Sequence, residues 1–261
     1  MRMEIGAVFL DVDGTLISFR THEVPCSAVE ALRAAHARGV RLFIATGRAA
    51  SDLEQLSGIP YDGVVSLNGA RCLTADGRVV SQRLIPREDF ERALRLADEL
   101  DFPLGLELEE GVFVNRVTPV VRELARLVAH PVPAETDLGR LFDRGGCCQM
   151  CFYCTPEQER RVMAELPSLV SSRWCPLFVD VNVRGVDKAT GMLAFASDCG
   201  VPAGALMAIG DGGNDVPMLR AAGVGVAMGN GCEEALAAAD WVTASVDDDG
   251  IRKALEHFGV I

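Results

Sequence analysis

Short apolar runs alternate with segments of helical character along the chain. The runs Ile5–Leu10, Val40–Ala45 and Ala205–Ile209 are almost continuously apolar, which is typical of strands buried on both faces of a parallel sheet. Between the first two runs, Ser27 and Glu30 have the spacing of a helix capping box, and Gly39 marks a helix end. Alternating strands and helices predict an α/β fold with a Rossmann-like, doubly wound parallel sheet.

A second set of elements begins near residue 84. A hairpin turned at Asp76-Gly77 closes the first set of elements. Helices are then predicted over 86–100, 119–128 and 156–166, and strands near 104–108, 112–115, 147–153, 172–175 and 178–183. We therefore expect a core formed by residues 1–83 and 184–261, with an inserted α+β cap domain formed by residues 84–183.

Composition limits the classes of partner. The chain has 261 residues, 49% of them hydrophobic, so it can bury a substantial core. Its formal net charge of −12 argues against nucleic acid and against an anionic membrane surface as partners. An anionic substrate is compatible with this charge only where the site is locally positive. The sequence indicates no obligate protein partner.

The chain contains no apolar stretch long enough to cross a bilayer, and the first residues show no small-residue cleavage pattern. We therefore expect a cytoplasmic protein. Its nine cysteines are an odd number, which, in a reducing compartment, argues against a disulfide framework.

Four cysteines gather between residues 147 and 154. Cys148, Cys151 and Cys154 have a CxxCxxC spacing, which is compatible with a metal site. A strand through this segment would place Cys148 and Cys154 on one face and Cys147 and Cys151 on the other, an arrangement that does not converge on one ion. We interpret the four as small buried side chains.

The segment Asp11–Thr15 has the pattern DxDGT and follows the first apolar run directly. In a strand of period two, Asp11 and Asp13 point to the same face, so that one carboxylate can attack while the other transfers a proton. Gly14 allows a ligand to approach the backbone closely. Ordinary turn chemistry is the alternative reading of this segment.

Three further segments carry candidate chemistry. Thr46-Gly47-Arg48 ends the second apolar run and offers a hydroxyl and backbone N–H groups to a phosphate. Lys188 lies near a helix start, where its ammonium can balance phosphate charge. Gly210–Asp215 places Asp211, Asn214 and Asp215 after the third apolar run, and such acids suit Mg²⁺. Since ligands bind at the carboxyl ends of parallel strands, we expect these segments to meet in one crevice.

These motifs, in this order, resemble those of the haloacid dehalogenase superfamily of aspartate-nucleophile phosphatases. The long interval between Arg48 and Lys188 can hold a large α/β cap, as in the Cof-type sugar-phosphate phosphatases, and the resemblance covers essentially the whole chain. The bacterial hexose-phosphate phosphatases are the most similar group. The resemblance implies an enzyme that hydrolyses small-molecule phosphate esters with Mg²⁺ through an aspartyl-phosphate.

The resemblance also implies roles for individual residues. Asp11 would be the nucleophile and Asp13 the general acid and base. The Mg²⁺ ligands would be Asp11, Asp13 through its main-chain carbonyl, Asp211 and Asp215. The residues that bind phosphate or substrate would be Val12, Gly14, Thr46, Gly47, Arg48, Lys188 and Asn214. Candidates for contacts with the leaving group are Asn68, Asp180 and Asn182.

Two alternatives remain open at this point. A phosphosugar mutase shares the carboxylate pair, but mutases usually place a helical cap between the first two motifs, where this chain has only a core helix and strand. A sugar-phosphate-binding regulator could retain the fold without turnover, yet this chain retains Asp11, Asp13 and Asp211. Pyridoxal phosphate and flavin mononucleotide are substrates of other members of the family, so the motifs alone leave the substrate open.

Overall fold

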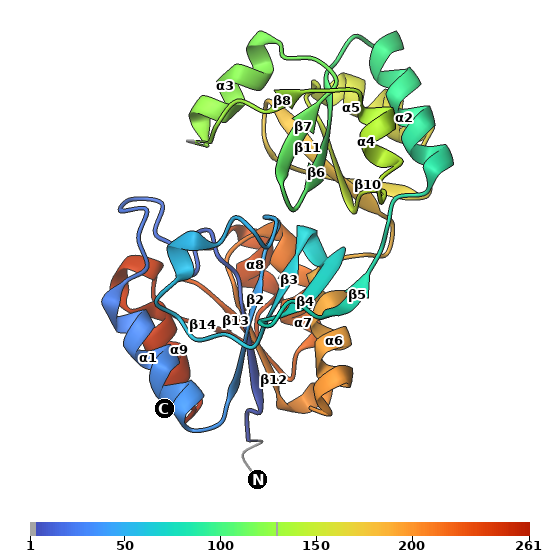
Figure 1. The fold of residues 1–261 in the computed structure, drawn as a ribbon. Helices are drawn as coiled ribbons and strands as arrows, with labels where there is room; N and C mark the ends of the chain where they lie inside the picture. The colour runs from blue at the N-terminus through green and yellow to red at the C-terminus, as the bar shows by residue number, and fades with distance from the viewer. Residues whose placement is uncertain (1–3, 129) are drawn as a thin grey trace. The chain divides into compact units, whose positions relative to one another are not determined.

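The computed structural model describes residues 4–128 and 130–261, and the chain forms two compact units (Figure 1). We call Met1–Ser81 with Val186–Ile261 the core unit, and Gln82–Gly185 the inserted unit. The boundaries expected from the sequence, after residues 83 and 183, each lie two residues from these. Gln82 ends strand β5 of the core sheet, and its side-chain amide donates a hydrogen bond to the Sγ of Cys148 in the inserted unit.

The core unit contains an eight-stranded sheet in the order β14-β13-β12-β1-β2-β3-β4-β5. The central strand β1 pairs in parallel with β2 on one side and with β12 on the other. The other pairings described for this sheet are parallel, except that the hairpin strand β4 pairs with β3 in the antiparallel direction. The strands are β1 (Ala7–Leu10), β2 (Arg41–Ala45), β3 (Gly63–Ser66), β4 (Arg71–Thr74), β5 (Val79–Gln82), β12 (Leu206–Gly210), β13 (Val224–Ala227) and β14 (Trp241–Val242).

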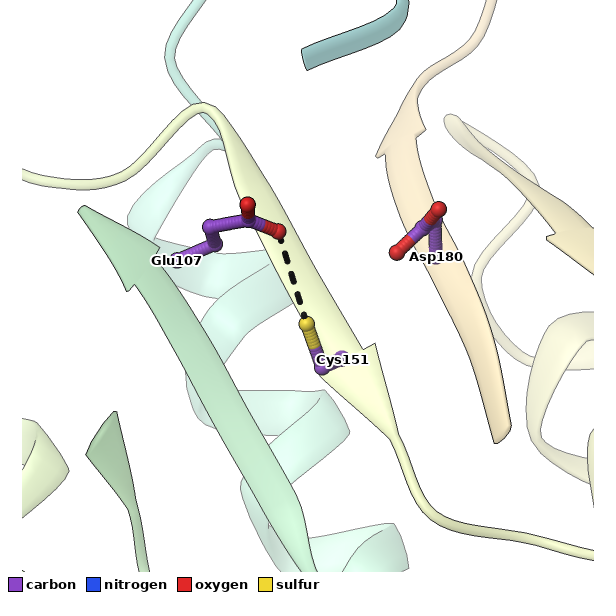
Figure 2. A group of neighbouring side chains, drawn as sticks. All are labelled: Glu107, Cys151 and Asp180. Carbon is purple, nitrogen blue, oxygen red and sulfur yellow. Dashed lines mark hydrogen bonds between the residues drawn. The ribbon is translucent and has the colours of Figure 1, made fainter. Parts of the chain in front are cut away.

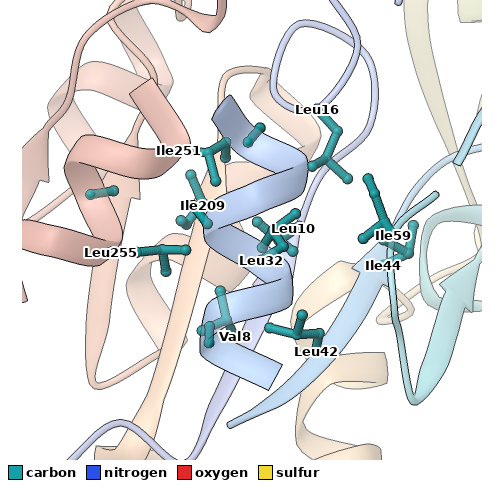
Figure 3. Close-up of a cluster of buried hydrophobic side chains, with 14 of the residues drawn as sticks. Val8, Leu10, Leu16, Leu32, Leu42, Ile44, Ile59, Ile209, Ile251 and Leu255 are labelled. Atoms are coloured by element: carbon teal, nitrogen blue, oxygen red, sulfur yellow. The ribbon is translucent and has the colours of Figure 1, made fainter. Parts of the chain in front are cut away.

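Helices cover both faces of this sheet. Along β1, Val8 and Leu10 pack with α1 and α9 (Figure 3), whereas Ala7 and Phe9 pack on the opposite face with α6, α7 and α8. The helices are α1 (Cys26–Ala37), α6 (Lys188–Cys199), α7 (Val216–Ala221), α8 (Glu233–Ala238) and α9 (Gly250–His257). Burial on both faces explains the continuous apolar runs, and the predicted doubly wound α/β core is confirmed.

Short 3₁₀ turns connect several elements of the core unit. They are η1 (Glu54–Leu56), η2 (Leu67–Gly69), η3 (Ala203–Ala205), η4 (Gly213–Asp215) and η5 (Val246–Asp248). Two of them, η2 and η4, follow the carboxyl ends of β3 and β12 directly. They therefore lie at the edge of the sheet where the sequence motifs were expected to meet.

The inserted unit contains a six-stranded, largely antiparallel sheet in the order β10-β11-β9-β6-β7-β8. One face packs on α2, α4 and α5, and α3 covers part of the other face. The strands are β6 (Leu104–Leu108), β7 (Gly111–Val114), β8 (Ala134–Glu135), β9 (Gln149–Phe152), β10 (Leu169–Cys175) and β11 (Phe178–Val183). The helices are α2 (Arg87–Glu99), α3 (Pro119–Leu127), α4 (Leu138–Phe142) and α5 (Pro156–Ala164). The predicted class, an α/β core with an inserted α+β domain, is confirmed.

Two local predictions were wrong. The expected capping box of Ser27 is absent, because α1 begins at Cys26 after Pro25 and leaves the hydroxyl of Ser27 inside the first turn without a partner. The expected alternation of the cysteines fails at Cys147, which packs in the same cluster as Cys154. Strand β9 begins only at Gln149, so the period of two does not extend back to Cys147.

All nine cysteines are free thiols, and six of them are buried. Within the described residues, no helix has the length and apolar character needed to cross a membrane.

Candidate active site

The parallel strands of the core unit bring three motifs to one edge of the sheet. Asp11 follows β1, Thr46 follows β2 and Asp211 follows β12. Because β1 lies between the other two strands, these residues come from neighbouring strand ends. The backbone N–H of Asp11 bonds to the carbonyl of Ile209 (3.0 Å), which ties the first motif to the end of β12. The expected convergence of these motifs therefore follows from the strand order.

Lys188 reaches this edge from the start of α6. Asp187 caps the helix by accepting a hydrogen bond from the N–H of Thr190 (2.8 Å). The side chain of Lys188 is fully buried, and its Nζ donates to Asp11 Oδ1 and to Asp215 Oδ1, both at 2.6 Å. Burial alone would lower the pKa of Lys188, but the two carboxylates outweigh it and raise that pKa. Lys188 therefore carries its positive charge inside the site.

Three carboxylates surround this charge. Asp11, Asp211 and Asp215 are all buried, and one oxygen from each lies within 4.8 Å of the others. Burial raises the pKa of Asp11 well above its usual value, and the charge of Asp215 adds to this effect. Burial and Asp215 likewise raise the pKa of Asp211 to about 6. The cluster holds more negative charge than Lys188 alone can balance.

This donor set fits a magnesium ion. Carboxylate oxygens are the ligands that Mg²⁺ prefers in proteins, and the raised pKa values of Asp11 and Asp211 show that the site favours added positive charge. Asp215 is fixed in place, since its Oδ2 accepts the backbone N–H groups of Asp211 (2.9 Å) and Gly212 (2.8 Å). Asp11, Asp211 and Asp215 are therefore the residues that could hold the ion.

Asp13 lies outside this group and pairs with Arg48. Arg48 Nε donates to Asp13 Oδ2 (2.9 Å), and Nη2 donates to Asp13 Oδ1 (2.5 Å). The third guanidinium nitrogen lies near Asp52 and Gln55. All three guanidinium nitrogens of Arg48 therefore contact other protein groups, and the predicted contact of Arg48 with substrate stays a prediction.

The tight turn after β1 packs against Asp211. The Thr15 hydroxyl donates to Asp211 Oδ1 (3.2 Å). Gly14 has a positive φ of 85°, and a Cβ there would lie 2.2 Å from Asp211 Oδ2. Val12 is buried, and its carbonyl accepts backbone N–H groups from Leu16 (2.9 Å) and from residues 15 and 17. The predicted contacts of Val12 and Gly14 with a phosphate would therefore come from backbone groups of this turn.

Sequence reasoning missed Asn230. Its side-chain amide donates to the carbonyl of Gly14 (2.8 Å) and lies 3.4 Å from Asp211 Oδ2, and its oxygen accepts the N–H of Val246 (2.8 Å). Asn230 therefore connects the first and last motifs. It lies between Gly229 and Gly231, just after β13, and a polar residue between two glycines at a strand end was the signal that could have found it.

Asn68 links Thr46-Gly47 to Asn214. Its N–H donates to the carbonyl of Thr46 (3.0 Å), and its Oδ1 accepts the side-chain amide of Asn214 (3.1 Å). A Cβ at Gly47 would lie 3.2 Å from the same Oδ1. Thr46 is buried, and its hydroxyl accepts the N–H of Arg48 (3.1 Å). The predicted catalytic, metal-binding and phosphate-binding residues thus lie in the core unit, whereas the leaving-group candidates Asp180 and Asn182 lie in the inserted unit.

A second group of acids lies in the inserted unit (Figure 2). Glu107, Cys151 and Asp180 come from the neighbouring strands β6, β9 and β11, with ligand atoms within 4.8 Å of one another. The Gln149 amide donates to Glu107 Oε2 (2.7 Å) and Asp180 Oδ1 (3.1 Å). Burial, together with Glu107, raises the pKa of Asp180 well above its usual value. Asn182 instead donates to the carbonyl of Cys148 (3.1 Å).

Comparison with known proteins agrees with this geometry. The profile of the haloacid dehalogenase-like hydrolase family matches residues 8–255. The phosphatase BT1666 from Bacteroides thetaiotaomicron is 53% identical, with a TM-score of 0.95 over 99% of this chain and 97% of that one. The subclass IIB sugar phosphatase BT4131 is 36% identical, with a TM-score of 0.88 over 98% and 99%. YkrA of Bacillus subtilis, named as a candidate phosphatase, is 29% identical over 99% of this chain and 100% of its own length.

The family recognised from the ordered motifs is thus confirmed, as is the enzyme class predicted from them. The match extends over both the core unit and the inserted unit, as expected for the Cof-type members. The chain is a phosphoric monoester hydrolase and belongs to the haloacid dehalogenase-like hydrolase family.

Proposed function

We propose that this phosphatase requires Mg²⁺ and hydrolyses phosphate monoesters of small metabolites, above all hexose phosphates, by way of a phosphorylated Asp11. The observation that carries the proposal is the buried contact of Asp11 with Lys188 beside Asp211 and Asp215. Lys188 and a bound cation can keep the carboxylate of Asp11 ionised, while its second oxygen attacks phosphorus. The cytoplasmic location expected from the sequence stays a prediction.

In the proposed reaction, Asp11 attacks phosphorus in line and the bond to the leaving oxygen breaks. Covalent catalysis of this kind divides one difficult displacement into two easier ones. Asp13 gives its proton to the leaving alkoxide and then takes a proton from the water that hydrolyses the acyl phosphate. Proton transfer by a positioned side chain contributes typically ~10² to 10⁴ in rate.

The charge of the phosphoryl group requires a positive site. When bound, Mg²⁺ would supply positive charge that offsets the repulsion between Asp11 and the phosphate. Lys188 already balances part of the charge of Asp11 and Asp215. Thr46, Gly47 and Asn214, which Asn68 connects, would hold the phosphoryl oxygens through a hydroxyl, a backbone N–H and an amide.

Support for a sugar phosphate comes from likeness to a protein described as a sugar phosphatase, which is 36% identical over 98% of this chain. We assign the inserted unit the role of the cap that selects the leaving group. Its acids Glu107 and Asp180 are hydrogen-bond acceptors of the kind that hydroxyl-rich molecules require.

Phosphate release from a panel of hexose phosphates, pyridoxal phosphate and flavin mononucleotide, measured with and without Mg²⁺, tests the proposal. We expect Mg²⁺-dependent release that is fastest with hexose phosphates and disappears in Asp11→Asn. Asp98→Asn, which changes an exposed aspartate of α2 and leaves the four motifs intact, is the matched control. Release that is independent of Mg²⁺ or survives in Asp11→Asn would overturn the mechanism, and preference for another ester would overturn the substrate. Interconversion of sugar-phosphate isomers would indicate a mutase.

A further inference from the structure

A pocket of about 450 Å³ opens at one end of the six-stranded sheet of the inserted unit. Its walls come from four segments, 101–103, 116–120, 153–158 and 176–177. These segments precede β6, follow β7, follow β9 and form the turn before β11, so the antiparallel order of the strands brings them together. Strand β11 begins beside this pocket and runs to Val183, where the chain leaves the unit. The pocket therefore lies at the end of the sheet away from that exit.

Two buried polar atoms of this pocket lack partners. Among the described residues, four buried side-chain nitrogen or oxygen atoms make no hydrogen bond, and two of them, Nε of Arg116 and Oγ1 of Thr118, belong to residues that line the pocket. Tyr153, which also lines the pocket, is only 5% exposed. Buried polar groups are usually hydrogen-bonded, so these two atoms are available to a polar ligand in the pocket.

Arg116 supplies a positive charge that is free to change partners. Its Nη2 contacts Asp101 at 2.8 Å, but the Asp101 side chain is 86% exposed. An exposed ion pair of this kind contributes little to stability. The guanidinium can therefore turn toward an anion in the pocket at small cost.

The start of α3 also favours an anion in this pocket. Thr118 is the N-cap residue of this nine-residue helix, yet its side chain caps no N–H group. The neighbouring α5 also begins at the pocket, but its N-cap Thr155 is fully used in a capping box with Gln158. Pro119, the first residue of α3, has no N–H, so the free N–H groups of the first turn are those of Val120 and Val121, which attract negative charge. Phe102, Pro176 and Leu177 give the pocket an apolar wall.

We propose that this pocket binds a small organic anion, with its carboxylate or phosphate group at Arg116 and Thr118 and its apolar part against Leu177. None of the residues that line this pocket has a role in the proposed reaction. The pocket would give this hydrolase a second ligand besides its substrate.

Titration of the ¹⁵N-labelled full chain with benzoate, followed by amide chemical shifts, tests the site. Benzamide serves as the uncharged probe of the same shape. We expect benzoate, but not benzamide, to shift the amides of Arg116, Val117, Thr118, Val120 and Val121 in a saturable way. In Arg116→Gln the dissociation constant should rise by about tenfold or more, as expected for loss of a charge-assisted hydrogen bond. Arg122→Gln, an exposed arginine of α3, should bind as the unchanged chain does.

Three outcomes would overturn the inference: no shift of these amides up to the solubility limit of benzoate, equal shifts with benzamide, or equal affinity in Arg116→Gln and Arg122→Gln. Should Arg116→Gln disturb the folding of the inserted unit, Thr118→Val takes its place, since it removes the unpaired hydroxyl at nearly constant volume. Weaker benzoate binding in a folded Thr118→Val supports the site, and unchanged binding in that variant contradicts it.

Discussion

Arg48 donates hydrogen bonds to both carboxylate oxygens of Asp13, from Nε to Oδ2 at 2.9 Å and from Nη2 to Oδ1 at 2.5 Å. This bidentate geometry fixes the plane of the carboxylate as well as its position. Burial alone would lower the pKa of Arg48, but its hydrogen bonds to Asp13 outweigh burial and raise that pKa, so Arg48 keeps its positive charge. Arg48 therefore orients the acid that the proposed reaction requires.

Substitution Arg48→Lys should reveal this orientation. Lysine keeps the positive charge but cannot donate the two parallel hydrogen bonds of the guanidinium. Asp13 would therefore be less well placed to protonate a leaving group. We expect turnover of alkyl phosphates to fall about 10- to 100-fold, within the range of proton-transfer catalysis. Turnover of p-nitrophenyl phosphate, whose leaving group needs no proton, should fall much less. Equal losses for both esters would show that Arg48 acts on the phosphoryl group instead.

Loss of Lys188 should destabilise the core unit. In Lys188→Met, Asp11, Asp211 and Asp215 would remain buried without a cation. Breaking a buried ion pair by removing one partner costs about 3 to 5 kcal/mol. Denaturant unfolding without metal measures this cost, and the loss should be smaller at pH 5 than at pH 8 because protonation relieves the repulsion. Lys253→Met, which changes the only other lysine of the chain at an exposed site, is the control.

The stabilising effect of Mg²⁺ should depend on pH. The pKa of Asp211 is raised to about 6 in the folded chain by burial and by Asp215. The folded state therefore binds this proton more tightly than the unfolded state does. Proton binding at Asp211 contributes fully to stability below the unfolded pKa of about 4, and this contribution is lost as the pH rises through 6. Mg²⁺ competes with this proton. We expect the rise in Tm on adding Mg²⁺ to be small at pH 5 and large at pH 7.5, and an equal rise at both would argue against Asp211 as a ligand.

Two glycines of positive φ should respond differently to alanine. Gly14 and Gly77 have φ values of 85° and 87°, but only a Cβ at Gly14 would meet other atoms, at 2.2 Å from Asp211 Oδ2. Gly77→Ala should therefore cost only the strain of the left-handed conformation, about 1 to 2 kcal/mol, with activity retained. Gly14→Ala should lose phosphatase activity as well as stability, since Asp211 must move. Activity assays and thermal unfolding of the two variants separate these effects.

The periodicity of the chain was sufficient to predict most of the fold. Continuous apolar runs such as Ile5–Leu10 predicted strands buried on two faces, and the structure places helices on both faces of β1. Parallel strands end at a common edge, so the order of the motifs alone predicted that Asp11 and Asp211 would meet. Local cues were weaker, because the N-cap of α1 is Pro25, two residues before Ser27, where the capping signal had placed it.

The sequence by itself determined which chemical groups are present and the strand ends from which they project, because these depend on residue type and on the period of the pattern. The tertiary structure decided which groups pair. Arg48 faces Asp13 across 35 positions, Lys188 bridges Asp11 and Asp215, and Asn230 joins Gly14 to Asp211. These contacts depend on side-chain direction and burial, which arise only when distant segments pack together.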